Sequence, residues 1–104
     1  MSSTIKIAVD AMGGDGSPKK IVDGIIHHYK DNKNTFYQIF GNQEIIQNHI
    51  TESLPKSCFE IIHTDETVRG TDSPLEAAKR GKTTSMWLAI QSVKEKKSDI
   101  VISA

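Results

Sequence analysis

The sequence predicts an α/β protein in which helices cover both faces of a parallel β-sheet. Short apolar runs alternate along the chain with segments of helical periodicity, and the turns between them are short. Strands of a parallel sheet are buried on both faces and read as near-continuous apolar runs, as Ile100 to Ile102 does. The 104 residues suffice for one modest hydrophobic core.

Each expected element is bounded by turn-forming or capping residues. The expected strands are residues 5–9, 36–40, 58–63 and 100–102. The expected helices are residues 18–30, a segment around 45–50 that stops near Leu54, a short segment from 73 to 81, and residues 84–96.

Two of these helices have predicted starts. Ser17 is expected to cap the first helix, with Pro18 at its first position, and Ser73 with Glu76 has the spacing of a capping box. The last helix is expected to pack through a stripe of apolar side chains, namely Met86, Trp87, Ala89, Ile90 and Val93.

Charge and composition exclude several classes of protein. The chain has 13 basic and 13 acidic residues, whereas a domain that binds nucleic acid through bulk charge is strongly basic. Cys58 is the only cysteine, so no internal disulfide can form. No apolar run approaches the roughly 20 residues that span a bilayer, and the start does not resemble a signal peptide. We therefore expect a cytoplasmic protein without a nucleic-acid partner.

The most distinctive stretch, residues 10–15, reads Asp-Ala-Met-Gly-Gly-Asp and connects the first strand to the first helix. Gly13 and Gly14 allow backbone N–H groups to approach an anion closely in such a turn. Asp10 and Asp15 would repel a phosphate. Three interpretations stay open for them: they fix the turn through hydrogen bonds to loop amides, they orient a partner cation, or they form ordinary Asx-turns and caps.

In parallel α/β sheets, ligands bind beyond the carboxyl ends of the strands. The loops that begin at Asp10, Gly41 and Thr64 should meet at that edge, and a fourth loop would begin at Ala104. Because the chain stops there, we expect residues 1–104 to be the amino-terminal part of a single larger α/β domain.

Two other functions are compatible with this fold class. A nucleotide-binding oxidoreductase domain is disfavoured because the first turn lacks Gly-x-Gly-x-x-Gly and no acidic residue closes the second strand. A non-catalytic, receiver-like signalling domain would suit the acidic residues near the first strand, but His63 and Thr64 occupy the place of the expected aspartate.

The motif at residues 7–15 closely resembles the amino-terminal signature of the bacterial phosphate acyltransferase family of phospholipid synthesis. Other segments resemble the same family in the same order. They are Gly41-Asn42, residues 61–66 and 72–77, Arg80, Lys82, Ser85-Met86 and residues 99–104.

This resemblance implies a function, a fold and partners. Members transfer a fatty acyl group from acyl carrier protein to inorganic phosphate, without a cofactor, and give acyl phosphate for phospholipid synthesis. Their fold is a parallel-sheet α/β/α sandwich similar to that of phosphotransacetylases and of the isocitrate and isopropylmalate dehydrogenases. Members are homodimers that associate peripherally with the membrane through a later segment. Since they are about three times as long, the 104-residue piece alone is expected to be inactive.

Phosphate itself is the nucleophile, so no side chain is assigned a catalytic role. The candidates for binding substrate or phosphate are Asp10, Gly13, Gly14, Asp15, Ser73, Arg80 and Lys82. Arg80 and Lys82 would supply positive charge, and Ser73 is expected mainly as a helix cap. His63 could act as an acid or base, or serve as a hydrogen-bonded structural residue. No residues have the spacing of a zinc site, so no metal is expected.

Overall fold

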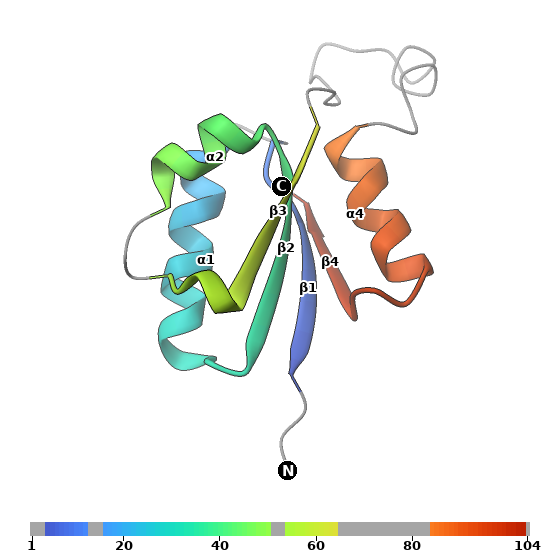
Figure 1. Cartoon of the computed structure of the whole chain (residues 1–104), viewed down its shortest axis with the longest axis horizontal. Coiled ribbons are helices and arrows are strands. Elements are labelled where there is room, and N and C mark those ends of the chain that lie inside the picture. The colour runs from blue at the N-terminus through green and yellow to red at the C-terminus, as the bar shows by residue number, and fades with distance from the viewer. Residues whose placement is uncertain (1–3, 13–15, 51–53, 65–83, 104) are drawn as a thin grey trace.

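The computed structural model contains one sheet of four parallel strands in the order β3-β2-β1-β4 (Figure 1). The structure describes residues 4–12, 16–50, 54–64 and 84–103. Its elements are β1 (Ile5–Asp10), α1 (Lys19–Asp31), β2 (Thr35–Gly41), α2 (Gln43–His49), the 3-10 helix η1 (Lys56–Cys58), β3 (Phe59–His63), α4 (Ser85–Lys94) and β4 (Ile100–Ser103). The predicted α/β class and parallel sheet are confirmed.

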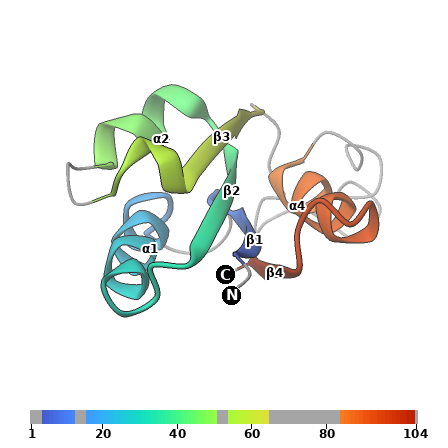
Figure 2. The same ribbon diagram turned by 60° about the horizontal axis from the view of Figure 1, so that its bottom comes forward.

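The described elements form three layers. Helices α1 and α2 lie against one face of the sheet and α4 lies against the other, as the turned view shows (Figure 2). The order β3-β2-β1-β4 places β4 beyond β1, so the connection from β3 to β4 runs in the opposite direction to those from β1 to β2 and from β2 to β3. Because such connections are right-handed, the reversed direction places α4 on the other face of the sheet. One layer on each face is the arrangement that a parallel sheet requires.

The larger part of the core lies between the sheet and helices α1 and α2. Alternate residues of β1 and β2 point to this side, because side chains of a strand alternate between its two faces. The buried members of this cluster are Ile7, Val9, Ala11, Val22, Ile25, Tyr37, Ile39, Ile46, Leu54 and Cys58. Tyr37 also places its hydroxyl 2.6 Å from Nδ1 of His28 on α1.

The face of α4 that meets the sheet is only partly the predicted one: Ala89 and Val93 pack on the sheet side as expected, together with Leu88, which the prediction left out. Its buried residues are Ser85, Ala89 and Ser92, whereas Trp87 and Ile90 are 39% and 46% exposed. Residues 85, 89 and 92 lie on one helix face, since they are spaced by four and three positions. Small side chains let the helix axis approach the sheet closely, so the expected apolar stripe is wrong for its two largest members.

Two predicted helix ends are also wrong. Pro18, not Ser17, holds the cap position of α1, where no side chain caps the helix and the Pro18 carbonyl accepts the Val22 N–H at 2.9 Å. Helix α2 stops at His49 instead of near Leu54, because Ile50 adopts an extended conformation and its N–H turns back to the Gln47 carbonyl. The short helix expected at residues 73–81 lies outside the described residues.

Candidate functional site

The carboxyl ends of the four strands meet at one edge of the sheet. Asp10 is paired in register with Phe40 on β2 and with Ser103 on β4, and Gly41 is paired with His63 on β3. The predicted meeting of the loops that begin at Asp10, Gly41 and Thr64 is therefore confirmed for the strand ends that the structure describes.

Asp10 lies at the centre of this edge and is 2% exposed. Its Oδ1 atom accepts a hydrogen bond from the Ser85 hydroxyl at 2.5 Å and another from the Met12 N–H at 3.2 Å. A buried carboxyl group needs such partners, because losing its hydration without replacement is costly. The bond to the amide two residues on is the contact of an Asx-turn and is also a hydrogen bond to a loop amide, so it fits both of these open interpretations of Asp10. Asp10 also connects β1 to the start of α4.

The segment after β1 is held by β2 as well. The Ala11 N–H donates to the Phe40 carbonyl at 3.0 Å, which continues the ladder beyond the strand. Met12 packs over Gly41: a Cβ atom built on Gly41 would lie 2.6 Å from Met12 Cγ and 2.9 Å from Cδ1 of Ile46. Glycine at position 41 therefore makes room for the Met12 side chain.

His63 and Thr64 occupy the end of β3. The Gln43 N–H donates to Nδ1 of His63 at 3.0 Å, so this imidazole caps the first turn of α2. The Thr64 N–H donates to the Gly41 carbonyl at 2.9 Å and extends the sheet by one residue. The interpretation of His63 as a hydrogen-bonded structural residue is confirmed.

The structure describes one of the seven predicted binding residues. Gly13, Gly14, Asp15, Ser73, Arg80 and Lys82 lie outside the described residues, so only Asp10 is placed. Ser85 was missed as a site residue. The signal that could have found it is its spacing from Ala89 and Ser92, which marks the small-residue face of α4.

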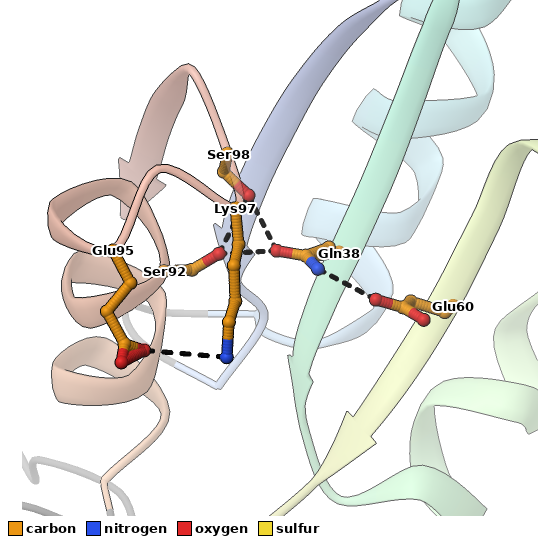
Figure 3. A network of polar contacts seen from close by, with 6 residues as sticks. All are labelled: Gln38, Glu60, Ser92, Glu95, Lys97 and Ser98. Carbon is orange, nitrogen blue, oxygen red and sulfur yellow. Dashed lines mark hydrogen bonds and ion pairs between the residues drawn. The ribbon is translucent and has the colours of Figure 1, made fainter.

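A second polar network fixes the other end of α4 (Figure 3). Oε1 of Gln38 on β2 accepts hydrogen bonds from the hydroxyls of Ser92 and Ser98, which lie 2.8 Å apart. Nε2 of Gln38 donates to Glu60 on β3 at 2.7 Å. The network borders a shallow pocket of about 180 Å³. Helix α4 is thus bonded to the sheet through a serine at each end, Ser85 to Asp10 and Ser92 to Gln38.

The groups with shifted pKa values lie in the core between the sheet and helices α1 and α2. Burial raises the pKa of the Cys58 thiol and the pKa of the Tyr37 hydroxyl. A buried thiol with a raised pKa is a poor nucleophile, which agrees with the absence of any sequence sign that Cys58 is activated.

Two further features of the described residues concern metal binding and the membrane. Within residues 4–12, 16–50, 54–64 and 84–103, no group of three or more His, Cys, Asp or Glu side chains is arranged to hold a metal ion. In the same part of the chain, no helix has the length and apolar character needed to cross a membrane.

Comparisons with known proteins identify relatives of this chain. The sequence matches the family described as "Fatty acid synthesis protein" over residues 5–104. It is 79% identical over 104 residues to a phosphate acyltransferase of Pelagibacter ubique (strain HTCC1062). The aligned region covers all of this chain and 31% of that relative. Phosphate acyltransferases of Listeria innocua and Enterococcus faecalis are 45% and 42% identical over 100 residues, which cover 96% of this chain and 29% of each relative.

The chain therefore spans less than a third of the length of these curated relatives. The match over residues 5–104 covers nearly the whole chain and agrees with the motif at residues 7–15. The chain belongs to the fatty acid synthesis protein family.

Proposed function

We propose that this chain is the amino-terminal part of a phosphate acyltransferase. The enzyme transfers a fatty acyl group from acyl carrier protein to inorganic phosphate and gives acyl phosphate for phospholipid synthesis. The observation that carries the proposal is the 79% identity, over all 104 residues, to the phosphate acyltransferase of Pelagibacter ubique.

The chemistry of this reaction fits a site at the carboxyl edge of the sheet. A phosphate oxygen attacks the thioester carbonyl, so the protein must hold a multiply charged anion and stabilise the developing oxyanion. We assign the backbone N–H groups of Gly13 and Gly14 to the anion, with positive charge from Arg80 and Lys82. Asp15 and the helix start at Ser73 complete the proposed binding loops.

Asp10 takes a supporting part in this proposal. Its Oδ1 atom bonds to Met12 and Ser85, within the protein, which suits a group that shapes the loop and does not contact phosphate. A carboxylate beside the phosphate would oppose binding by charge repulsion.

The proposed active form is larger than the 104 residues. We infer a single α/β domain with the fold of the phosphotransacetylases and the isocitrate and isopropylmalate dehydrogenases, of which residues 1–104 form the first part. The active protein is proposed to be a cytoplasmic homodimer that binds the membrane peripherally through a segment beyond this chain. The larger size is supported by the 31% of the Pelagibacter ubique relative that the chain covers, and the 104 residues alone are expected to be inactive.

The two other functions have less support at the strand ends. An oxidoreductase that binds NAD holds the ribose with an acidic residue after the second strand, but Gly41 ends β2 and Asn42 caps α2 through its bond to the Ile45 N–H. A receiver-like domain needs an aspartate where β3 ends in His63.

A chimera tests the proposal directly. This chain replaces the matching amino-terminal segment of the Pelagibacter ubique phosphate acyltransferase, and the purified protein is incubated with acyl-acyl carrier protein. We expect release of the carrier-protein thiol that depends on added phosphate, with acyl phosphate as the product. A folded chimera that releases no thiol, beside an active Pelagibacter parent, would refute the proposed function.

A further inference from the structure

Three polar groups meet at the carboxyl edge of the sheet: the Asp10 carboxyl and the Met12 N–H at the end of β1, and the Ser85 hydroxyl at the start of α4. We propose that Ser85 is a positioning residue that holds, through Asp10, the loop after β1 in the conformation that binds phosphate. This inference rests on the proposed phosphate acyltransferase function and adds to it a residue of α4.

The contact between Ser85 and Asp10 is short and buried. The two residues are 1% and 2% exposed, and the hydroxyl and Oδ1 lie 2.5 Å apart. A hydroxyl–carboxylate bond of this length is among the stronger hydrogen bonds in proteins. Because both groups are shielded from solvent, removing the hydroxyl deprives Asp10 of this partner without an easy replacement by water.

The same Oδ1 atom transmits this constraint to the loop. It accepts the Met12 N–H at 3.2 Å, and Met12 directly precedes Gly13. Residues 11 and 12 are otherwise held from β2, through the bond of Ala11 to Phe40 and the packing of Met12 on Gly41. Ser85 adds a constraint from α4, so the described start of the loop, up to Met12, is held both from β2 and from α4.

The Ser85 hydroxyl donates its single hydrogen to Asp10. This arrangement suits positioning and not nucleophilic attack, for which phosphate itself serves in the proposed reaction. Ser85 therefore affects phosphate binding through Asp10 and the loop, without contacting the substrate.

Ser92 provides a matched control on the same helix. Ser92 is also a buried serine whose hydroxyl donates to a side chain of the sheet. Its acceptor is Gln38 on β2, and Ser92 lies near the opposite end of α4 from Ser85. Both Ser85→Ala and Ser92→Ala delete one buried hydroxyl, so both lower the melting temperature. Only Ser85→Ala is expected to alter the loop after β1.

The experiment measures phosphate kinetics in the chimera. Ser85→Ala should raise the KM for inorganic phosphate about tenfold, equivalent to about 1.4 kcal/mol, with kcat within about twofold. Ser92→Ala should leave this KM within about twofold. Asp10→Asn keeps an acceptor oxygen and should therefore raise KM less than Asp10→Ala. Asp10→Ala and Ser85→Ala break the same contact. The double variant should therefore raise the KM for phosphate by less than the product of the two single increases.

A second measurement does not depend on activity. Amide hydrogen exchange in the peptide that contains Met12 should be faster in Ser85→Ala than in the parent, and unchanged in Ser92→Ala. If the parent chimera has no phosphate-dependent activity, the proposed function fails while this exchange still tests the positioning role. Equal effects of the two serine variants on Met12 exchange would overturn the inference, and so would equal effects on KM in an active chimera. Should Ser85→Ala not fold, Ser85→Cys, a weaker donor of similar shape, takes its place.

Discussion

The contact between Gly41 and Met12 gives a sharp test of how the carboxyl edge is built. In Gly41→Ala, the new Cβ would lie 2.6 Å from Met12 Cγ, 2.9 Å from Met12 Sδ and 2.9 Å from Cδ1 of Ile46. Carbon atoms normally approach to about 3.5–4.0 Å, so the overlap with Met12 is about 1 Å. The cause is not φ strain, since Gly41 continues the extended strand β2.

Relief of this overlap requires the whole Met12 side chain to rotate about its Cα–Cβ bond, or the segment after β1 to shift, because Cγ is not the free end of the Met12 side chain. Overpacking of this kind costs about 1–3 kcal/mol in the free energy of unfolding. For a domain of this size, that cost corresponds to a fall in melting temperature of about 5–20 °C.

Thermal unfolding followed by circular dichroism measures this fall. Gly24→Ala is the matched control: no atom lies within 4 Å of its added Cβ, and the position is inside helix α1. Alanine there should raise the free energy of unfolding by about 0.5–1 kcal/mol. In a double variant, Met12→Ala should recover part of the loss caused by Gly41→Ala, since Ile46 still opposes the new Cβ. An unchanged melting temperature in Gly41→Ala would refute the proposed packing of Met12.

Three further predictions concern pH, helix packing and the proposed phosphate site. Burial raises the pKa of the Cys58 thiol above its ordinary 9.0 and the pKa of the Tyr37 hydroxyl above its ordinary 10.0. The folded state therefore keeps these protons up to a higher pH than the unfolded state does. The contribution of these two groups to the free energy of unfolding should therefore be fully present below about pH 9 and decrease as the pH rises above it. Urea unfolding at a series of pH values measures this decrease, which should be smaller in Cys58→Ala. Ala89→Leu should destabilise the protein by about 1–3 kcal/mol and Ile90→Ala by less, which urea unfolding measures, and the reverse order would contradict the observed face of α4. In the chimera, Arg80→Ala should raise the KM for phosphate or for acyl carrier protein about tenfold, and unchanged values for both would remove Arg80 from the proposed site.

Much of the fold follows from local patterns. The four strands were predicted within one or two residues at each end, because continuous apolar runs such as Ile7 to Val9 are typical of buried parallel strands. The expected burial is wrong for the edge strand β4, where Ile100 and Ile102 are 50% and 48% exposed. The caps were less predictable. Thr84 caps α4 through its bond to the Trp87 N–H, whereas the sequence suggested Ser17 for α1, where Pro18 holds the cap position. Cap positions shift by a residue because they depend on the path of the preceding loop.

Among the candidate site residues, the part played by Asp10 could be predicted only in outline. A carboxylate beside a glycine turn suggested a hydrogen bond to a loop amide, and the bond to the Met12 N–H is such a contact. Its second partner, Ser85, is 75 positions away in the sequence, so no local pattern connects the two.

The sequence by itself determined the α/β class, the approximate strand and helix segments and the family, because hydrophobic periodicity and a specific motif are local properties of the chain. Only the tertiary structure decided which face of α4 is buried and what Asp10 contacts. Apolar periodicity favoured Trp87 and Ile90, but close approach of a helix to a sheet requires small side chains, and Ser85, Ala89 and Ser92 provide them. That approach brings the Ser85 hydroxyl to Asp10, so the contact depends on the distance between two packed layers.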